Sequence, residues 1–486
     1  MTTTFRLLTA ALILIALRSA SQDMQGLLIS PYSGTHSVHI NPSLILHSRY
    51  AINIAPATGL VFAENNFLYI PREDFSLGRL RRFDFPEYDG GRNFIDRPDN
   101  LPRHAYIHGR LMGPSFMISV GNRHAFAFTN SVRTSTTVQN IPHNVAKFLL
   151  EGLEYPPQQN IRFTNDHGMN AGSLGWLEYG FTYAAKIAGR YDESFSAGIT
   201  LKYLQAYHGG YLTASMIDYM TPHKDTLHIY LMNATGGFSI PLDRATNEFL
   251  GTEQPFRGSG FAFDLGFSYT RYLSAQSTRR MRRLCRYPYQ PYRFKIGFAL
   301  TDFGNIRFAR QAQQLLFDNI SADLYDVSSI TYNNIDYFID ELALKLTASP
   351  DGLDGGNNFS MFLPSAISVQ ADYNFENRFF LGGVWIQHLP FAENHLSRPS
   401  YVSVIPRFET DHFEAAIPIS LYRYNQLRAG AFLRYRYISV GTDNLAGFLG
   451  YTDFGGIDFY FAIHYGIFKG KCPDPFARDR DCDFFR

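Results

Sequence analysis

Large apolar residues occupy every second position through long stretches of this chain. In the segment 457–468 the positions between them are polar, small or amphipathic, and the apolar set is Ile457, Phe459, Phe461, Ile463, Tyr465 and Ile467. Successive side chains of a β-strand point to opposite faces of its sheet, so this segment predicts a strand with one continuous apolar face. Six further segments repeat the pattern, at 177–187, 199–203, 261–270, 294–301, 367–375 and 427–437.

The length of these segments decides between two β architectures. Strands of soluble proteins usually run about 5–6 residues, whereas a strand that crosses a bilayer needs about 9–11. Several of the segments reach the longer range. The sequence therefore predicts an all-β protein, a transmembrane antiparallel β-barrel. The alternative is a soluble antiparallel sandwich, which shows the same alternation in shorter strands.

Strand candidates number about fourteen, and they lie at 50–62, 104–119, 123–132, 173–189, 194–208, 225–238, 259–273, 290–303, 363–374, 378–388, 400–409, 412–422, 426–440 and 455–468. Counted back from the last strand, the long connection 304–362 falls on the periplasmic side, where barrels have short turns. This conflict indicates that one strand is miscounted, and the segment 209–258 is the one in question.

Composition agrees with a barrel. Aromatic residues make up 16% of the chain, with 31 Tyr and 43 Phe, yet the mean hydropathy is only −0.17. Half of each barrel strand faces the interior and stays polar, so a membrane barrel need not be hydrophobic overall. The formal net charge of +1 gives no long-range field for nucleic acid, which we exclude as a partner.

The first 21 residues have the features of a secretory signal peptide. Arg6 supplies the positive start, residues 7–17 form a short apolar run, and Ser19-Ala20-Ser21 offers a small-residue cleavage site. A β-barrel behind such a signal is expected in the outer membrane, with outer-membrane lipid around it. We therefore expect four parts: a signal peptide at 1–21, an N-terminal plug segment at 22–49, the barrel at 50–469, and a periplasmic tail rich in Cys and Asp at 470–486.

Polar residues on the inward face of the predicted strands are the candidates for chemistry in the lumen. The ones we single out are Asp264, Asp372, Arg428, Arg434, Arg436, Asp458 and His464. Charges of both signs predict ion pairs across the lumen that hold a plug. Arg428, Arg434 and Arg436 share one face of a predicted strand, a positive ladder that either binds an anionic ligand or pairs with Asp458 and other carboxylates.

No motif for catalysis or for a cofactor occurs in the sequence. Gly-x-Ser-x-Gly, phosphate-binding Gly-rich loops and His-Glu-x-x-His are all absent. We therefore expect neither an enzyme nor a bound cofactor or metal.

Three short motifs carry a family resemblance. Gly34-Thr35-His36 through Asn41-Pro42-Ser43 stands near the start, Leu363-Pro364-Ser365 opens a strand, and Ser439-Val440-Gly441 through Leu445 precedes the last strand. With these motifs the chain resembles an uncharacterised family of outer-membrane barrels from Bacteroidota, itself similar to the long-chain fatty-acid transporter superfamily. Those transporters have Asn-Pro-Ala near the start of the plug, and Ser43 replaces the Ala here. The resemblance implies about fourteen strands and an N-terminal plug whose motif is Asn41, Pro42 and Ser43.

The resemblance leaves two functions open, because the wider superfamily includes importers of hydrophobic molecules and also a barrel of the type IX secretion pathway. We expect a barrel that binds or transports a small hydrophobic or amphipathic molecule, since a plugged lumen and large loops suit such a ligand. The alternative is a barrel that does not transport and instead docks cell-envelope or secretion proteins, through the insertion 304–362 and the Cys-containing tail.

A disulfide is expected in the tail. Cys472 and Cys482 lie close in sequence, and export to an oxidising compartment favours a bond between them. Mass spectrometry of non-reduced peptides from exported protein should therefore find the linked pair. The short loop limits the stabilisation of the tail to about 2–3 kcal/mol. Two free thiols would contradict the prediction.

Overall fold

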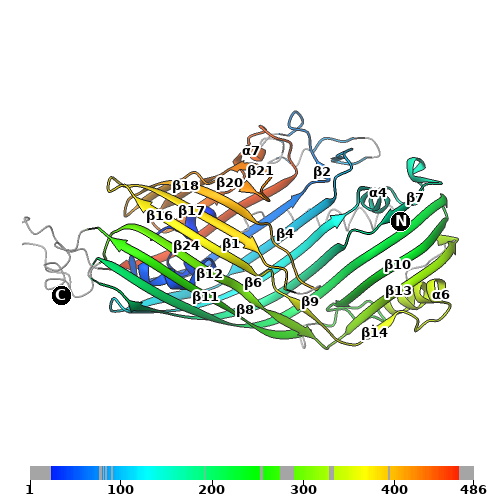
Figure 1. Ribbon diagram of the computed structural model, residues 1–486, viewed down its shortest axis with the longest axis horizontal. Helices are drawn as coiled ribbons and strands as arrows, with labels where there is room; N and C mark the ends of the chain where they lie inside the picture. The colour runs from blue at the N-terminus through cyan, green and yellow to red at the C-terminus, as the bar shows by residue number, and fades with distance from the viewer. Residues whose placement is uncertain are drawn as a thin grey trace, which may run out of the picture.

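The strands of this protein form one antiparallel sheet that closes into a barrel (Figure 1). Closure is made by the first and last strands, β1 (Tyr50–Asn65) and β24 (Gly456–Phe468), which pair antiparallel from Tyr50 opposite Phe468 to Glu64 opposite Gly456. The predicted fold, an all-β barrel of 14 antiparallel strands, is confirmed. The computed structural model describes residues 23–75, 79, 82, 85–88, 91–190, 192–251, 255–273, 289–327, 333–391 and 394–469.

Two of the predicted parts lie outside the described residues. They are the signal peptide at 1–21 and the tail at 470–486 with Cys472 and Cys482, and both stay predictions.

Ten of the barrel spans are single strands. They are β1, β6 (His124–Ile141), β8 (Met169–Ala188), β9 (Glu193–His223), β11 (Gly258–Tyr272), β12 (Tyr292–Phe308), β17 (Phe379–His388), β18 (Tyr401–Glu409), β23 (Ile438–Thr442) and β24. Each of the other four is interrupted once: β4 (Arg103–Met112) with β5 (Ser115–Val120), β15 (Phe359–Phe362) with β16 (Ala366–Asn374), β19 (Phe413–Ala416) with β20 (Ile419–Tyr422), and β21 (Gln426–Ala429) with β22 (Ala431–Tyr435).

Proline accounts for three of the four interruptions. Pro114, Pro364 and Pro418 lie in the breaks of β4–β5, β15–β16 and β19–β20, and Gly430 lies in the fourth. Proline has no N–H and cannot donate a hydrogen bond to the neighbouring strand, so the ladder skips the residue. The chain on both sides of each break still pairs with the same neighbouring span.

The outward face of the barrel carries the apolar stripes that the sequence predicted. On β24 the exposed residues are Phe459, Phe461, Ile463, Tyr465 and Ile467, and the buried ones between them are Asp458, Tyr460, Ala462 and His464. The same alternation holds on β11, where Asp264, Ser268 and Thr270 point inward. An apolar outer surface around a closed barrel places this protein in the outer membrane.

Helices are few and short in the described part of the chain. They are α2 (Gln25–Leu28), η1 (Gly34–His39), η2 (Pro42–His47), α4 (His143–Glu151), η3 (Pro156–Gln158), α6 (Ile335–Thr347) and α7 (Leu445–Phe448). None of these described helices has both the length and the apolar character needed to cross a membrane.

The two ends of the barrel differ in the length of their connections. One end has short turns at 121–123, 189–192, 375–378, 410–412 and 436–437, and the longer connection 273–291. The other end has the connections 66–102, 142–168, 224–257, 309–358, 389–400, 423–425 and 443–455. β1 begins and β24 finishes at the first end, which is therefore the periplasmic one. The insertion after β12 is therefore extracellular, and the conflict noted in the sequence did come from the strand count.

Two errors in the strand count cancelled in the predicted total. The candidate at 225–238 is β10 (Thr226–Ser239), which pairs with the far part of β9 beyond the closed barrel and is not one of the spans. The candidate at 426–440 contains the span β21–β22 and also the start of β23, joined by a turn at Arg436 and Tyr437. The suspected segment 209–258 does hold the first error.

Beyond the barrel the sheet continues on one side as an extracellular extension (Figure 1, right). It consists of residues 209–223 of β9, β10, β13 (Ala312–Tyr325) and β14 (Asp354–Gly356), with β7 (Arg162–Asn165) against β9. Helix α6 covers it through an apolar cluster of Ile229, Leu324, Ala343, Leu346 and Leu353. A separate two-stranded sheet, β2 (Leu68–Tyr69) and β3 (Ile95–Asp96), lies in the connection 66–102.

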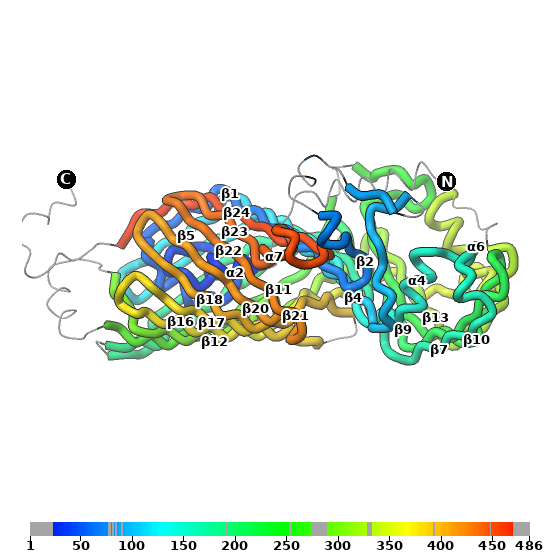
Figure 2. Tube along the Cα trace, turned by 90° about the horizontal axis from the view of Figure 1, so that it is seen from above, coloured from blue at the N-terminus to red at the C-terminus, as the bar shows by residue number. Residues whose placement is uncertain are grey.

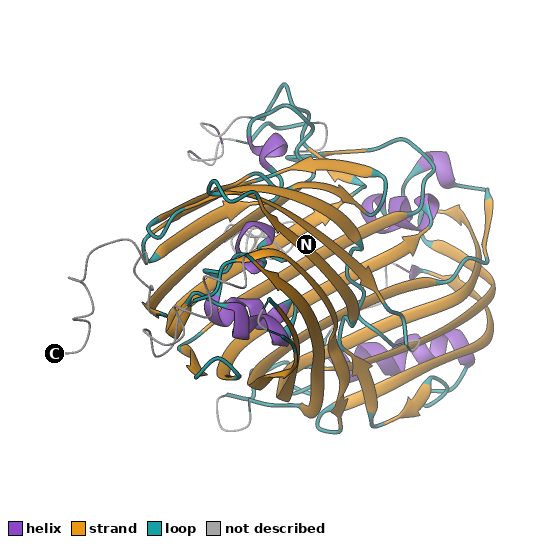
Figure 3. Cartoon of the chain, turned by 60° about the vertical axis from the view of Figure 1, so that its left-hand side comes forward, coloured by secondary structure: helices purple, strands orange, loops and turns teal. Residues whose placement is uncertain are grey.

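Residues 23–48, the N-terminal segment, lie inside the barrel. Figure 2 and Figure 3 show α2 and the two 3-10 helices η1 and η2 enclosed by the strands. Its apolar side chains, among them Leu27, Leu28 and Ile29, share a buried cluster with inward-facing residues such as Phe432 and Tyr460.

Phe461 tests the assignment of the two faces. It lies near the middle of β24 and is exposed on the outward side. Phe461→Arg should lower the free energy of unfolding in lipid vesicles by about 2–4 kcal/mol, because the charge enters hydrocarbon. Urea unfolding followed by heat-modifiable electrophoresis measures this, with Phe461→Leu as the control that stays close to the parent. An unchanged unfolding midpoint for Phe461→Arg would place this residue away from lipid.

Candidate functional site

The N-terminal segment is fixed by hydrogen bonds to the barrel wall, and the side chain of Asn41 makes several of them. Its Oδ1 accepts from Ser43 N at 2.9 Å and from Ser43 Oγ at 2.7 Å, which caps η2 with Pro42 at its first position. Its Nδ2 donates to the Phe267 carbonyl at 3.0 Å and to Gln370 Oε1 at 2.9 Å. The expected motif Asn41, Pro42 and Ser43 thus ties this segment to β11 and β16.

Glycines on the inward face make this close approach possible. A Cβ at Gly266 would lie 2.1 Å from Asn41 Oδ1, and one at Gly198 would lie 2.7 Å from the Pro42 carbonyl carbon. Both distances are shorter than any van der Waals contact allows, so larger side chains at these two strand positions would displace η2.

Histidines connect the N-terminal segment to the first and last strands of the barrel. His36 Nε2 lies 2.7 Å from Thr58 Oγ1 of β1, and its Nδ1 lies 2.8 Å from the Ser33 carbonyl oxygen. The predicted lumen residue His464 is buried beside it, with the two rings edge to face at 5.9 Å. Burial lowers the pKa of His36 to about 4, so this ring is neutral at neutral pH.

A first buried ion network joins five neighbouring strands. Arg133 of β6 donates to Glu178 Oε2 of β8 at 2.8 Å and to both oxygens of Asp302 of β12 at 2.9 Å. Lys202 of β9 donates to Asp302 Oδ1 at 2.6 Å and reaches Asp264 Oδ2 of β11 at 2.7 Å. The predicted lumen residue Asp264 is therefore one acceptor in a network of strand-to-strand pairs.

A second buried network lies on the strands β16, β18, β19 and β22. Arg407 of β18 donates to Asp372 Oδ2 of β16 at 3.0 Å and to Glu409 Oε1 at 2.8 Å. Arg434 of β22 donates to Glu414 Oε2 of β19 at 2.9 Å. Asp372 and Arg434 are thus held by partners within the wall. The charged groups of these two networks are therefore bound to one another.

The predicted positive ladder does not form. Arg428 pairs with Glu64 at 2.7 Å and its guanidinium lies 3.7 Å from the centre of the Tyr422 ring. Arg434 belongs to the second network. Arg436 has a positive φ of 51° in the turn between β22 and β23 and is exposed, so its expected place in the lumen is wrong. The strand finishes before Arg436, and a tight turn has no inward face to present it.

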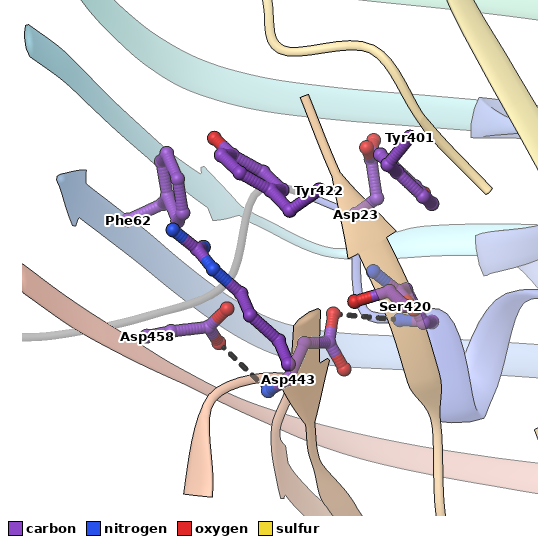
Figure 4. Close-up of a pocket in the computed structure, with 9 residues that line it drawn as sticks. Asp23, Phe62, Tyr401, Ser420, Tyr422, Asp443 and Asp458 are labelled. Carbon is purple, nitrogen blue, oxygen red and sulfur yellow. Dashed lines mark hydrogen bonds between the residues drawn. The ribbon is translucent and has the colours of Figure 1, made fainter. Parts of the chain in front are cut away.

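Arg428 and Asp458 line a small polar cavity at the extracellular end of the N-terminal segment (Figure 4). Asp458 Oδ1 accepts from Asp443 N at 3.1 Å, and Asp443 Oδ2 accepts from Gln25 N at 3.3 Å. The cavity volume is about 10 Å³. A space of that size accepts one water molecule and excludes organic ligands.

An apolar pocket lies on the other side of the wall, at the extracellular rim, and we name it the rim pocket. Its volume is about 440 Å³, within the range of small-molecule sites. It is lined by Ala63, Glu64, Asn65, Leu68, Tyr69, Ile70, Phe85, Asn93, Phe94, Ala105, Ile107, Phe454, Gly455, Gly456 and Ile457. The floor comes from β1, β4 and β24, and the roof comes from the connections 66–102 and 443–455.

Ion pairs hold the roof of the rim pocket in place. Arg92 donates to both carboxylate oxygens of Glu151 on α4, at 2.9 and 2.7 Å, and this hydrogen bonding lowers the pKa of Glu151. Lys147 of α4 reaches Asp96 at 2.9 Å. Both pairs flank the lining residues Asn93 and Phe94. On the other side, Phe454 stacks on Phe75 with ring centres 4.0 Å apart.

The rim pocket was missed at the sequence level. Its one local signal is the density of aromatic residues in the connection 66–102, including Phe67, Tyr69, Phe85 and Phe94, which a purely solvated loop does not need. Among the described residues, no group of three or more His, Cys, Asp or Glu suited to a metal occurs.

Comparison with solved structures returns outer-membrane barrels at low similarity. The Ralstonia pickettii toluene transporter TbuX matches at 8% identity and a TM-score of 0.41, over 94% of this chain and 100% of that one. A Pseudomonas aeruginosa FadL homologue matches at 10% identity and 0.39, over 92% and 96%. The Pseudomonas putida toluene transporter TodX matches at 8% identity and 0.32, over 92% and 97%. Scores this low do not transfer a function to this chain.

Comparison with curated protein sequences gives no significant match. A family model does match, over residues 90–443, and its description is a family of unknown function, DUF5723. The matched region runs from the connection before β4 to the end of β23 and so covers most of the barrel. This chain belongs to the DUF5723 family.

Proposed function

We propose that this outer-membrane barrel binds a small hydrophobic or amphipathic molecule in the rim pocket. The observation that carries the proposal is the pocket itself, about 440 Å³ with Tyr69, Phe85, Phe94 and Phe454 around it. Binding sites for small molecules are concave and mostly apolar, with a few polar groups that orient the ligand. Asn65 and Asn93 are polar groups of this kind in the lining.

We further propose that the N-terminal segment acts as a plug. Its hydrogen bonds through Asn41 and its apolar contacts to Phe432 and Tyr460 fix the segment within the lumen. Free diffusion of solutes, as in a general porin, is inconsistent with such a lumen. Passage of any solute through the lumen then requires displacement of this segment.

The competing function is a barrel that docks cell-envelope or secretion proteins. Its structural support is the extracellular extension of β9, β10 and β13, which adds surface beyond what closure of the barrel requires. Native mass spectrometry of the purified barrel separates the two functions. A lipid-like or hydrophobic ligand on the isolated chain supports binding, whereas stoichiometric protein partners without such a ligand support docking.

Ala105→Trp tests the rim pocket directly. Ala105 is half-buried on the outward face of β4 and lines the pocket, so an indole there should occupy the ligand's place. Losing room for two methylenes costs about 1.6 kcal/mol, which is about tenfold in affinity. Titration of the purified protein in micelles with the fluorophore N-phenylnaphthylamine should show this loss.

Ala197→Trp is the matched control for Ala105→Trp. Ala197 is also outward-facing and half-buried, on β9, and it does not line the pocket. The control should bind the fluorophore as the parent does. Equal affinities for the parent and Ala105→Trp would place the binding site elsewhere.

Removal of residues 25–45 tests the plug. The deletion eliminates Asn41 and the apolar contacts of α2, so the lumen should open to small solutes. Vesicles that contain the deleted protein should swell in isotonic sugar solution, whereas vesicles with the full chain should stay sealed. Heat-modifiable electrophoresis confirms that the deleted protein is folded. A folded deletion variant that leaves the vesicles sealed would overturn the plug proposal.

A further inference from the structure

The rim pocket lies on the membrane side of the barrel wall. Its floor residues Ala63, Ala105 and Ile107 alternate along their strands with residues that face the lumen, such as Phe62 and Tyr106. Ile457 likewise precedes the buried Asp458. These floor side chains therefore lie on the outward face of the strands, the face that contacts lipid nearer the middle of the membrane.

The wall beneath the pocket is continuous. Ala63 pairs with Ile457 on one side and with Ile107 on the other, within ladders that run without a shift from Ala57 to Glu64 against β24 and from Thr58 to Asn65 against β4. Neighbouring strands lie about 4.8 Å apart, which leaves no passage for an organic molecule. A ligand of the rim pocket therefore does not arrive from the lumen.

Apolar side chains lead from the pocket down into the bilayer. Phe459, Phe461 and Ile463 follow Ile457 in steps of two along β24, and all three are exposed. On β4, Leu111 follows Ile107 on the same face, and 57% of its surface is exposed. The floor of the pocket is thus the upper end of the lipid-facing surface. An apolar chain reaches it from the outer leaflet without crossing water.

Aromatic residues shield the pocket from the aqueous side. The roof rings of Tyr69, Phe85, Phe94 and Phe454 belong to connections at the extracellular end, above the strands. Aromatic side chains prefer the boundary between hydrocarbon and water, so this roof closes the pocket toward water. The opening that remains favourable for an apolar ligand faces the membrane.

We propose that the rim pocket holds the hydrocarbon chain of an outer-leaflet lipid, which enters from the bilayer. The inference rests on the proposed function, because it names the ligand class and the entry side of the same pocket. It also makes this face of the barrel a site that withdraws a lipid chain from the leaflet and covers it with protein.

Photo-crosslinking in vesicles tests the inference on the full-length protein. The probe is a phosphatidylcholine with a diazirine near the end of one acyl chain, mixed into the vesicle lipid. Peptide mapping should find crosslinks at the belt residues Phe461 and Ile463, as for any barrel. It should also find them at the roof residues Tyr69 and Phe94, which lipid meets only inside the pocket.

Two variants sharpen the readout. Ala105→Trp should remove the roof crosslinks and keep the belt crosslinks, which also show that the variant is folded and inserted. Ala197→Trp should keep both sets. Crosslinks confined to the belt in the parent, or roof crosslinks that persist in Ala105→Trp, would overturn the inference.

The fluorophore titration in micelles separates this inference from the proposed function. The parent protein could bind the fluorophore, with weaker binding in Ala105→Trp, and still give no roof crosslinks. That result would support the proposed function and overturn the lipid inference. If the parent protein neither binds the fluorophore nor gives roof crosslinks, both the proposed function and the lipid inference are overturned.

Discussion

The pairing of β1 with β24 is the contact on which the rest of the structure depends. Hydrocarbon offers no partner for backbone N–H and C=O groups, so a sheet that crosses a bilayer must have no open edge. Twelve paired positions, from Tyr50 opposite Phe468 to Glu64 opposite Gly456, remove the two edges here. Proline in three spans is compatible with closure, because each break skips a residue while the span keeps its neighbours.

Closure at this strand number creates an interior that must be filled. A lumen lined by one face of every strand holds many polar groups, and each buried charge needs a partner. The two ion networks, built around Arg133 and around Arg407, supply partners between strands. The N-terminal segment supplies the remaining volume, with Asn41 bonded to the wall where Gly266 leaves room for it. The glycine on the strand and the asparagine on the N-terminal segment are therefore complementary in shape.

The sequence predicts the barrel but does not predict correctly which segments span the membrane, and the reason is physical. Alternation reports only that one face of a strand is apolar, and β10 has such a face because it packs under α6 outside the membrane. Its pattern is therefore that of a spanning strand. The reverse error, at 426–440, came from a turn at Arg436 and Tyr437 with no glycine or proline in it, where Arg436 takes a positive φ.

The sequence predicts whether a side chain points into the lumen or outward, because the alternation within one strand determines this. Asp264, Asp372 and Asp458 point inward because alternation alone decides it. Their partners come from other strands, and the pairing of Asp264 with Lys202 or of Arg428 with Glu64 depends on register and barrel shape. The rim pocket could not be predicted from the sequence, because its lining comes from β1, β4, β24 and two connections that are distant in sequence.

The charge of the lumen explains why an apolar site lies outside it. An apolar ligand among Arg133, Glu178 and Asp302 would separate ions that stabilise one another, and separating buried ions is costly. The outward face beneath the rim pocket presents Ala63, Ala105 and Ile107, and an apolar ligand there needs only a cover on the aqueous side. The connection 66–102 provides that cover, and the pairs Arg92–Glu151 and Lys147–Asp96 fix it to α4. The ligand site thus forms where a long extracellular connection meets the lipid-facing wall.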